Sequence, residues 1–96
     1  MRNQFLEYSI LTILAKVDRP LSEYRLGSEV SFVLDEPNLS SAEFNDALSW
    51  LSNHNLISKN ITLLGTIRWV ILDLGREAIK EFEMLKLNHV SKEAVK

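Results

Sequence analysis

The sequence contains no cysteine among its 96 residues. This excludes disulfide bonds, thiolate metal sites and a cysteine nucleophile. Long apolar runs are missing as well, because the most apolar stretch, residues 5–17, is too short to span a bilayer and is interrupted by Glu7. No clear small-residue cleavage site follows that stretch, so we expect no secretory signal and a cytoplasmic protein.

Basic residues are absent from the middle of the chain. No Lys or Arg occurs between Arg25 and Lys59. The same stretch does contain acidic residues, namely Glu29, Asp35, Glu36, Glu43 and Asp46. The formal net charge of the whole chain is -2. Contact with nucleic acid would therefore need a local cluster of cations, because the protein as a whole does not attract phosphate.

Glycine and proline are scarce, with three and two residues, and no internal repeat, low-complexity tract or linker is present. The hydrophobic content of 46% is enough for one core in a chain of this length. We therefore predict a single domain over residues 1–90, followed by a flexible tail over residues 91–96.

The first helix is expected within residues 5–17, and it is apolar on two sides. One face is formed by Leu6, Ile10, Ile13, Leu14 and Val17, and the second by Tyr8, Leu11 and Ala15. A helix of this kind needs two packing partners. Residues 18–20 end it, and Ser22 can cap a second helix that ends near Leu34. This second helix is expected to turn Tyr24, Leu26 and Val30 inward.

A third helix is predicted after a loop at residues 35–38. Ser40 and Glu43 have the spacing of a capping box. Helical spacing then brings four apolar residues to one face, namely Phe44, Ala47, Leu48 and Leu51. Asn55 is suited to the left-handed turn that ends such a helix.

A hairpin and a fourth helix complete the chain. Residues 56–62 and 66–72 are rich in β-branched residues, and Leu64 and Gly65 lie between them as a turn. Asp73 can cap a helix whose main body spans residues 76–90. The predicted fold class is α+β and mostly α: three helices, a two-stranded hairpin and a C-terminal helix.

Three local patterns resemble those of winged helix-turn-helix domains. Residues 48–57 resemble the family's run of leucine, polar residues, leucine, polar residues, glycine, leucine and isoleucine, with Asn55 in the place of the glycine. Residues 69–79 resemble the family's ending, with Leu72 in the place of the threonine cap. Residues 19–26 are similar to the start of the second helix in PadR-type and MarR-type regulators. The resemblance covers residues 5–82 and implies a wing formed by the hairpin.

The resemblance also implies a nucleic-acid interface. The third helix would enter the major groove, and the wing would touch the backbone or the minor groove. Position by position, the helix would present Ser41, Ala42, Asn45, Asp46, Ser49 and Asn53 to the groove. The amides of Asn45 and Asn53 suit adenine edges. The cations placed to hold a backbone are Arg25, Lys59 and Arg68, for which ordinary solvated surface is the alternative.

Two features allow a protein-binding role. Trp50 occupies a position that is usually at least partly solvent-exposed in the family. Leu63 and Leu64 lie at the hairpin tip, where DNA-binding wings generally carry basic or small polar residues. An exposed Trp next to two leucines would form an interaction patch. The alternative for Trp50 is a core or edge contact with the first helix or the hairpin.

The apolar surface of the first and fourth helices exceeds what one small core covers. By resemblance, a homodimer would form through Tyr8, Leu11, Ala15, Met84, Leu87 and Val90. The alternative is that these residues are ordinary monomer surface.

Catalysis, cofactors and metals are not expected. His54 and His89 lie far apart in the sequence without carboxylate or cysteine companions at ligand spacing, and no nucleophile motif or phosphate-binding glycine loop is present. The favoured interpretation is a bacterial or phage-type DNA-binding transcriptional regulator acting as a homodimer. The alternative is a winged-helix protein-interaction module that does not bind DNA.

Overall fold

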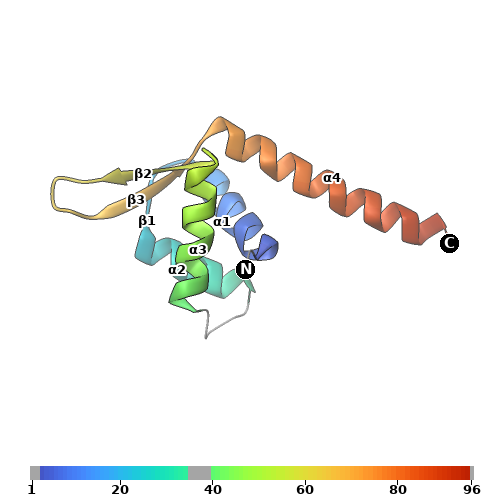
Figure 1. Ribbon diagram of the computed structural model, residues 1–96, viewed down its shortest axis with the longest axis horizontal. Helices are drawn as coiled ribbons and strands as arrows, with labels where there is room; N and C mark the ends of the chain where they lie inside the picture. The colour runs from blue at the N-terminus through green and yellow to red at the C-terminus, as the bar shows by residue number, and fades with distance from the viewer. Residues whose placement is uncertain (1–2, 35–39, 96) are drawn as a thin grey trace.

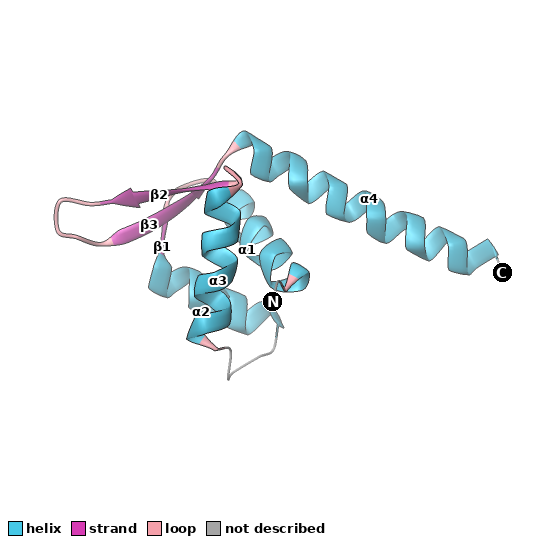
Figure 2. Cartoon of the chain, viewed as in Figure 1, coloured by secondary structure: helices cyan, strands magenta, loops and turns pink. Residues whose placement is uncertain are grey.

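Three short helices pack under one end of a small sheet, and a fourth helix leads away from it (Figures 1 and 2). The computed structural model describes residues 3–34 and 40–95, with side chains up to residue 84. The elements are α1 (Gln4–Val17), β1 (Leu21–Ser22), α2 (Glu23–Leu34), α3 (Ser41–Asn53), β2 (Ile57–Ile61), β3 (Ile67–Ile71) and α4 (Asp73–Val95). The sheet is antiparallel in the order β1-β3-β2.

Helix α1 lies at the centre and contacts α2, α3, α4 and β3. These several partners explain its two apolar sides. Ile10 and Leu11 point to different sides of the helix, and both are fully buried. The Asn3 side chain caps the helix by accepting a hydrogen bond from the Leu6 N–H at 3.1 Å. At the other end, Asp18 takes the left-handed conformation with φ 50°.

Helix α2 begins after Ser22, whose hydroxyl accepts a hydrogen bond from the Arg25 N–H at 3.2 Å. Leu26 and Val30 are buried as predicted. The inward placement of Tyr24 was wrong, because its side chain is 87% exposed. Two residues along a helix correspond to about 200°, so a residue two before Leu26 points to the opposite side.

Strand β1 was not predicted, because two residues are too few to show an alternating pattern. It pairs Leu21 with Trp69 and Ser22 with Arg68 on β3. This pairing joins the start of α2 to the hairpin. The Trp69 side chain is buried, and its Nε1–H donates to Glu23 Oε1 at 3.0 Å.

Helix α3 confirms the cap and the apolar face predicted from the sequence. The Ser40 hydroxyl accepts from the N–H groups of Ala42 and Glu43. The buried residues of α3 are Phe44, Ala47, Leu48 and Leu51. Asn55 has the predicted left-handed conformation, with φ 61°. The loop predicted at residues 35–38 lies outside the described residues.

The hairpin β2-β3 is also confirmed, with register from Ile57 opposite Ile71 to Ile61 opposite Ile67. Its turn is closed by Gly65, which has φ 82°. The root of the hairpin lies on the helices, whereas its tip projects away from them (Figure 1).

Helix α4 begins at Asp73 itself, so Leu72 and not Asp73 takes the cap position; its carbonyl accepts from the N–H groups of Gly75 and Arg76. The Arg76 guanidinium also donates to the Asp18 carboxylate at 2.6 Å, which ties the start of α4 to the end of α1. Beyond α1 the helix extends from the body (Figure 1). It runs through the predicted tail segment as far as Val95, and the flexibility of that segment stays a prediction.

Candidate nucleic-acid interface

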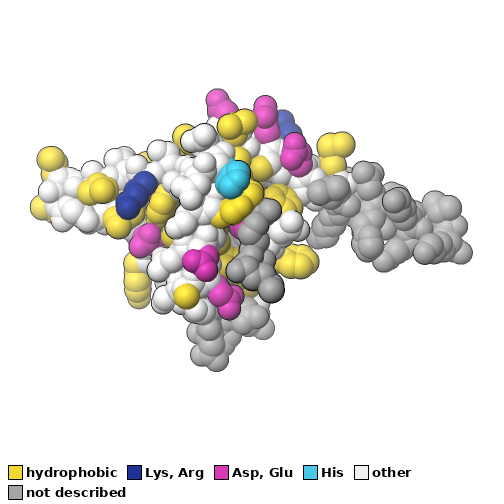
Figure 3. Space-filling model, viewed as in Figure 1, with side chains coloured by type: hydrophobic (Ala, Val, Ile, Leu, Met, Phe, Trp, Pro, Cys, Tyr) yellow, Lys and Arg dark blue, Asp and Glu magenta, His cyan; other side chains and the backbone are white. Residues whose placement is uncertain are grey.

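The six residues predicted to face a DNA groove are all exposed on α3: Ser41, Ala42, Asn45, Asp46, Ser49 and Asn53. The helix therefore presents the expected face to solvent. Glu43 and Asp46 make that face acidic, and Figure 3 shows acidic side chains over α3 with no Lys or Arg among them.

The two hairpin cations point to opposite faces of the sheet. Residues directly opposite one another in antiparallel strands share a face, and successive residues alternate. Lys59 is opposite Trp69 and so shares the face that packs on the core. Arg68 is opposite Asn60 and next to Ser22, on the other face. Both cations are exposed, but the hairpin does not join them into one strip.

Arg25 lies near the Arg68 side of the hairpin. Its backbone N–H donates to the hydroxyl of Ser22, and Ser22 pairs with Arg68. Successive residues of a strand alternate between the two faces of the sheet. Ser58, Asn60 and the partly buried Val70 therefore lie on the same face as Arg68. We call the polar residues of this face, Ser22, Ser58, Asn60 and Arg68, the polar strip. It contains hydrogen-bonding groups and a cation but no carboxylate.

Trp50 is half-buried and packs against the edge of the core. Its side chain thus makes a core contact and is also partly exposed to solvent. Its ring stacks on His54, with ring centroids 3.9 Å apart and an interplanar angle of 22°. Leu63 and Leu64 lie in the turn between β2 and β3, and this tip of the hairpin projects away from α3 and α1 (Figure 1). The expectation of one continuous patch of Trp50 with the two leucines was therefore wrong.

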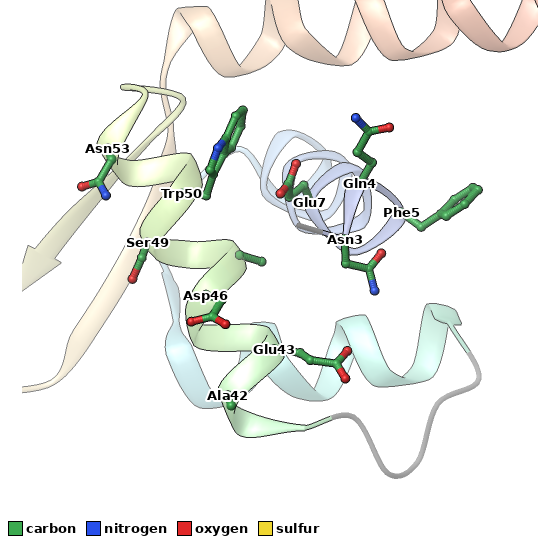
Figure 4. Close-up of a pocket in the computed structure, with 11 residues that line it drawn as sticks. Asn3, Gln4, Phe5, Glu7, Ala42, Glu43, Asp46, Ser49, Trp50 and Asn53 are labelled. Atoms are coloured by element: carbon green, nitrogen blue, oxygen red, sulfur yellow. The ribbon is translucent and has the colours of Figure 1, made fainter. Parts of the chain in front are cut away.

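Trp50 instead lines an open groove of about 910 Å³ between α3 and the first turns of α1 (Figure 4). The groove residues are Asn3, Gln4, Phe5, Glu7, Ala42, Glu43, Asp46, Ala47, Ser49, Trp50 and Asn53. Three of them are acidic and none is Lys or Arg. Sequence reasoning missed this site, because the groove joins segments that are distant in the chain. The interruption of an apolar run by Glu7, whose side chain is buried, was the available clue.

The residues predicted to form a dimer are partly used within one chain. Leu11 is fully buried in the core, and Tyr8 packs edge-on against Phe82 of α4 with ring centroids 5.6 Å apart. The Tyr8 hydroxyl donates to Glu83 Oε1 at 3.4 Å. Burial, the negative charge of Glu83 and this hydrogen bond raise the pKa of Tyr8 above its usual value.

The other predicted dimer residues differ in solvent exposure. Ala15 is half-buried against the core, whereas Met84 is exposed. The side chains of Leu87 and Val90 lie outside the described residues. The second apolar side of α1 is thus covered at least in part by α4 of its own chain.

A metal site and a membrane-spanning helix each have structural requirements. Among the described residues, no group of three or more His, Asp or Glu side chains is arranged to hold a metal ion. No helix within them combines the length and the apolar character needed to cross a membrane.

Helices, hairpin and terminal helix in this arrangement form the winged-helix fold. Solved structures of three other proteins are among those that resemble it. A PadR-like transcriptional regulator from Bacillus cereus has a TM-score of 0.72 at 22% identity, over 95% of this chain and 88% of the other. F93 from STIV, described as a winged-helix DNA-binding protein, has a TM-score of 0.73 at 18% identity, over 88% of this chain and 90% of the other.

RosR of H. salinarum has a TM-score of 0.72 at 18% identity, over 88% of this chain and 74% of the other. No family profile and no curated protein sequence matches the chain. The predicted winged-helix fold and the likeness to PadR-type proteins are confirmed. At these identities the likeness establishes the fold and not the activity.

Proposed function

We propose that this protein is a homodimeric DNA-binding transcriptional regulator of the cytoplasm that contacts DNA chiefly through its hairpin and the start of α2. The observation that carries the proposal is a separation of charge. Helix α3 contains Glu43 and Asp46 but no cation, whereas residues 57–72 contain Lys59 and Arg68 but no acid. Phosphate neutralisation supplies most non-specific affinity for DNA, so the hairpin is the element suited to it.

The polar strip supports the same assignment. Arg, Ser and Asn side chains are common donors to phosphate oxygens, and such contacts set the position of a protein on a duplex. Arg25 adds a third, exposed cation near this strip, because its backbone N–H donates to the hydroxyl of Ser22, which pairs with Arg68. The printed descriptions of F93 and of the Bacillus cereus protein are consistent with DNA as the ligand.

Helix α3 has a secondary role in this proposal. Ser41, Asn45, Ser49 and Asn53 are exposed and can hydrogen-bond to base edges. Glu43 and Asp46 lie on the same helix without a neighbouring cation on α3, and they would repel phosphates on either side of a groove. Binding is therefore expected to be weak on mixed sequence. Three cations per protomer predict a slope of log affinity against log salt of about -3 per protomer.

Fluorescence anisotropy with a random-sequence duplex pool at low salt tests this proposal. We expect Lys59→Ala combined with Arg68→Ala to abolish binding. Lys80→Ala, which removes an exposed cation from α4, should leave the affinity unchanged. If the hairpin double variant binds DNA as well as the wild type, the hairpin is not the contact surface.

A second candidate function is a protein-interaction module, favoured by the groove between α1 and α3. The exposed carboxylates of Glu43 and Asp46 and the aromatic rings of Phe5 and Trp50 suit a basic peptide, since guanidinium groups pair with carboxylates and stack on aromatic rings. This moves the proposed protein contact from the hairpin tip to the groove.

An arginine-rich peptide and an acidic peptide of equal length would distinguish this candidate. In a Trp69→Phe background, the basic peptide should change the fluorescence of Trp50, and Glu43→Gln with Asp46→Asn should remove the response. A response to both peptides, or to neither, would exclude a charge-selective groove.

A further inference from the structure

The hairpin ends in two leucines that nothing in the described part of the chain covers. Leu63 and Leu64 have exposures of 105% and 94%. They lie in the turn between β2 and β3, at the tip of a hairpin that projects away from the helices (Figure 1), and Figure 3 shows apolar side chains at that end of the molecule. Large apolar side chains at such a tip lower solubility without adding to the core, and a ligand that covers them would offset this cost.

Hydrogen bonds around the turn fix the backbone that carries both leucines. The Thr62 N–H donates to the Thr66 carbonyl at 2.9 Å, and the Gly65 N–H donates to the Thr62 carbonyl at 2.9 Å. The Thr66 N–H also donates to the Thr62 hydroxyl at 3.1 Å. Gly65 supplies the positive φ that closes the loop. The backbone of a tip ordered in this way loses little conformational freedom when it binds.

The two cations of the hairpin lie behind the tip, one on each strand and one register position apart, because Lys59 is opposite Trp69 and Arg68 is opposite Asn60. Lys59 lies four residues before Leu63, and Arg68 lies four residues after Leu64. Because Leu63 and Leu64 lie in the turn beyond the strands, the extended length of four residues, about 13 Å, is an upper limit on the distance from each leucine back to Lys59 or Arg68. The two side chains point to opposite faces of the hairpin. A ligand that receives the apolar tip would therefore meet one positive charge on each side.

The DNA minor groove has this form, because it is about 7.5 Å deep and has a sugar-phosphate strand on each side. Leucine side chains are among those that enter the minor groove as wedges, unstack a base step and kink the duplex. We propose that Leu63 and Leu64 are such a wedge, with Lys59 and Arg68 on the two flanking phosphate strands. This inference rests on the proposed DNA-binding function and adds a bending activity to it.

The wedge also predicts where the protein prefers to bind. Pyrimidine–purine steps such as TA unstack and kink more easily than other steps, so they should be favoured even without base-specific hydrogen bonds. Sequence selection would then come from DNA deformability at the wing. Such selection at the wing is consistent with the charge of α3, because Glu43 and Asp46 repel phosphate groups.

The test uses the full chain and a duplex labelled at both ends for energy transfer, with 2-aminopurine beside a central TA step. We expect the wild type to bend the duplex by about 20° or more. 2-Aminopurine fluorescence should rise severalfold as the step unstacks. Leu63→Ser with Leu64→Ser should remove both signals, while the affinity at low salt falls less than about threefold. Phe32→Ser, which removes a similarly exposed apolar side chain from α2, should change neither signal.

The outcomes separate the wedge from the function on which it rests. Binding that depends on Lys59 and Arg68 but leaves the duplex straight, or a bend that persists in the leucine double variant, would overturn the wedge alone. Failure of the wild type to bind any duplex in the pool would overturn the DNA-binding function, and the wedge with it.

Discussion

Among single residues, the glycines at positions 27 and 75 differ in the space available for a side chain. A Cβ on Gly75 would lie 2.7 Å from Ile71 Cγ1 and would clash with the Leu56 carbonyl oxygen. A Cβ on Gly27 would meet Phe44 at 3.5 Å, an ordinary contact. Gly75 therefore permits the close approach of α4 to the hairpin root, whereas Gly27 occupies a helix position that alanine would fill.

We predict that the two alanine substitutions change stability in opposite directions. Gly75→Ala should destabilise the protein by about 1–3 kcal/mol, since backbone must move to admit the methyl group. Gly27→Ala should stabilise it by up to about 1 kcal/mol through helix propensity. Urea unfolding followed by circular dichroism measures both. Equal effects of the two substitutions would contradict the packing of α4 against Leu56.

Among the elements, α4 is attached to α1 by an aromatic pair, a hydrogen bond and an ion pair. Tyr8 contacts Phe82 and donates to Glu83, while the Arg76–Asp18 ion pair holds the start of the helix. Because the pKa of Tyr8 is raised, the folded protein favours the neutral phenol. This contribution to stability is fully present below the ordinary pKa of about 10 and is lost as the pH rises through the folded-state value.

We predict that absorbance titration of the Tyr24→Phe variant, in which Tyr8 is the remaining tyrosine, gives a midpoint above about 10. Glu83→Gln should lower that midpoint, because it removes the negative charge beside the phenol. Tyr8→Phe should reduce the loss of stability at high pH. A midpoint that does not respond to Glu83→Gln would show that α4 is not held against α1 in this way.

In the molecule as a whole, the extended α4 and the exposed Met84 are the features that favour a homodimer. Tyr8 and Leu11 are engaged within one chain, so the predicted interface depends more on α4 than on α1. A dimer would also place two hairpins on one ligand, which suits the two half-sites of a DNA operator.

We expect sedimentation at micromolar concentration to show a dimer. Met84→Glu with Leu87→Glu should give a monomer, since charges would be buried in the interface. Ile61→Glu is a matched control, because Ile61 on the hairpin is 61% exposed and Met84 is 62% exposed. A wild-type monomer, or dissociation by Ile61→Glu but not by the α4 changes, would contradict an interface formed by α4.

The order of the helices and the hairpin, the Ser40 cap, the left-handed turn at Asn55 and the buried face of α3 could all be predicted from the amino-acid sequence. These features depend on local propensity and on spacing within one element, so neighbouring residues are enough to indicate them. The charge difference between α3 and the hairpin was also visible there. Tyr24 was misplaced, because two residues along a helix turn its side chain to the side opposite the buried Leu26.

Which segments meet, in contrast, depends on the packing of the folded chain. That packing pairs β1 with β3, covers the second side of α1 with α4, and brings Phe5 and Glu7 to α3 to form the groove. It also directs the tip of the hairpin away from α3, which carries Trp50, and places Lys59 and Arg68 on opposite faces of the hairpin. Each of these results depends on contacts or strand register between segments that are distant in the chain. Residue types and local spacing alone do not indicate which segments meet or in what register.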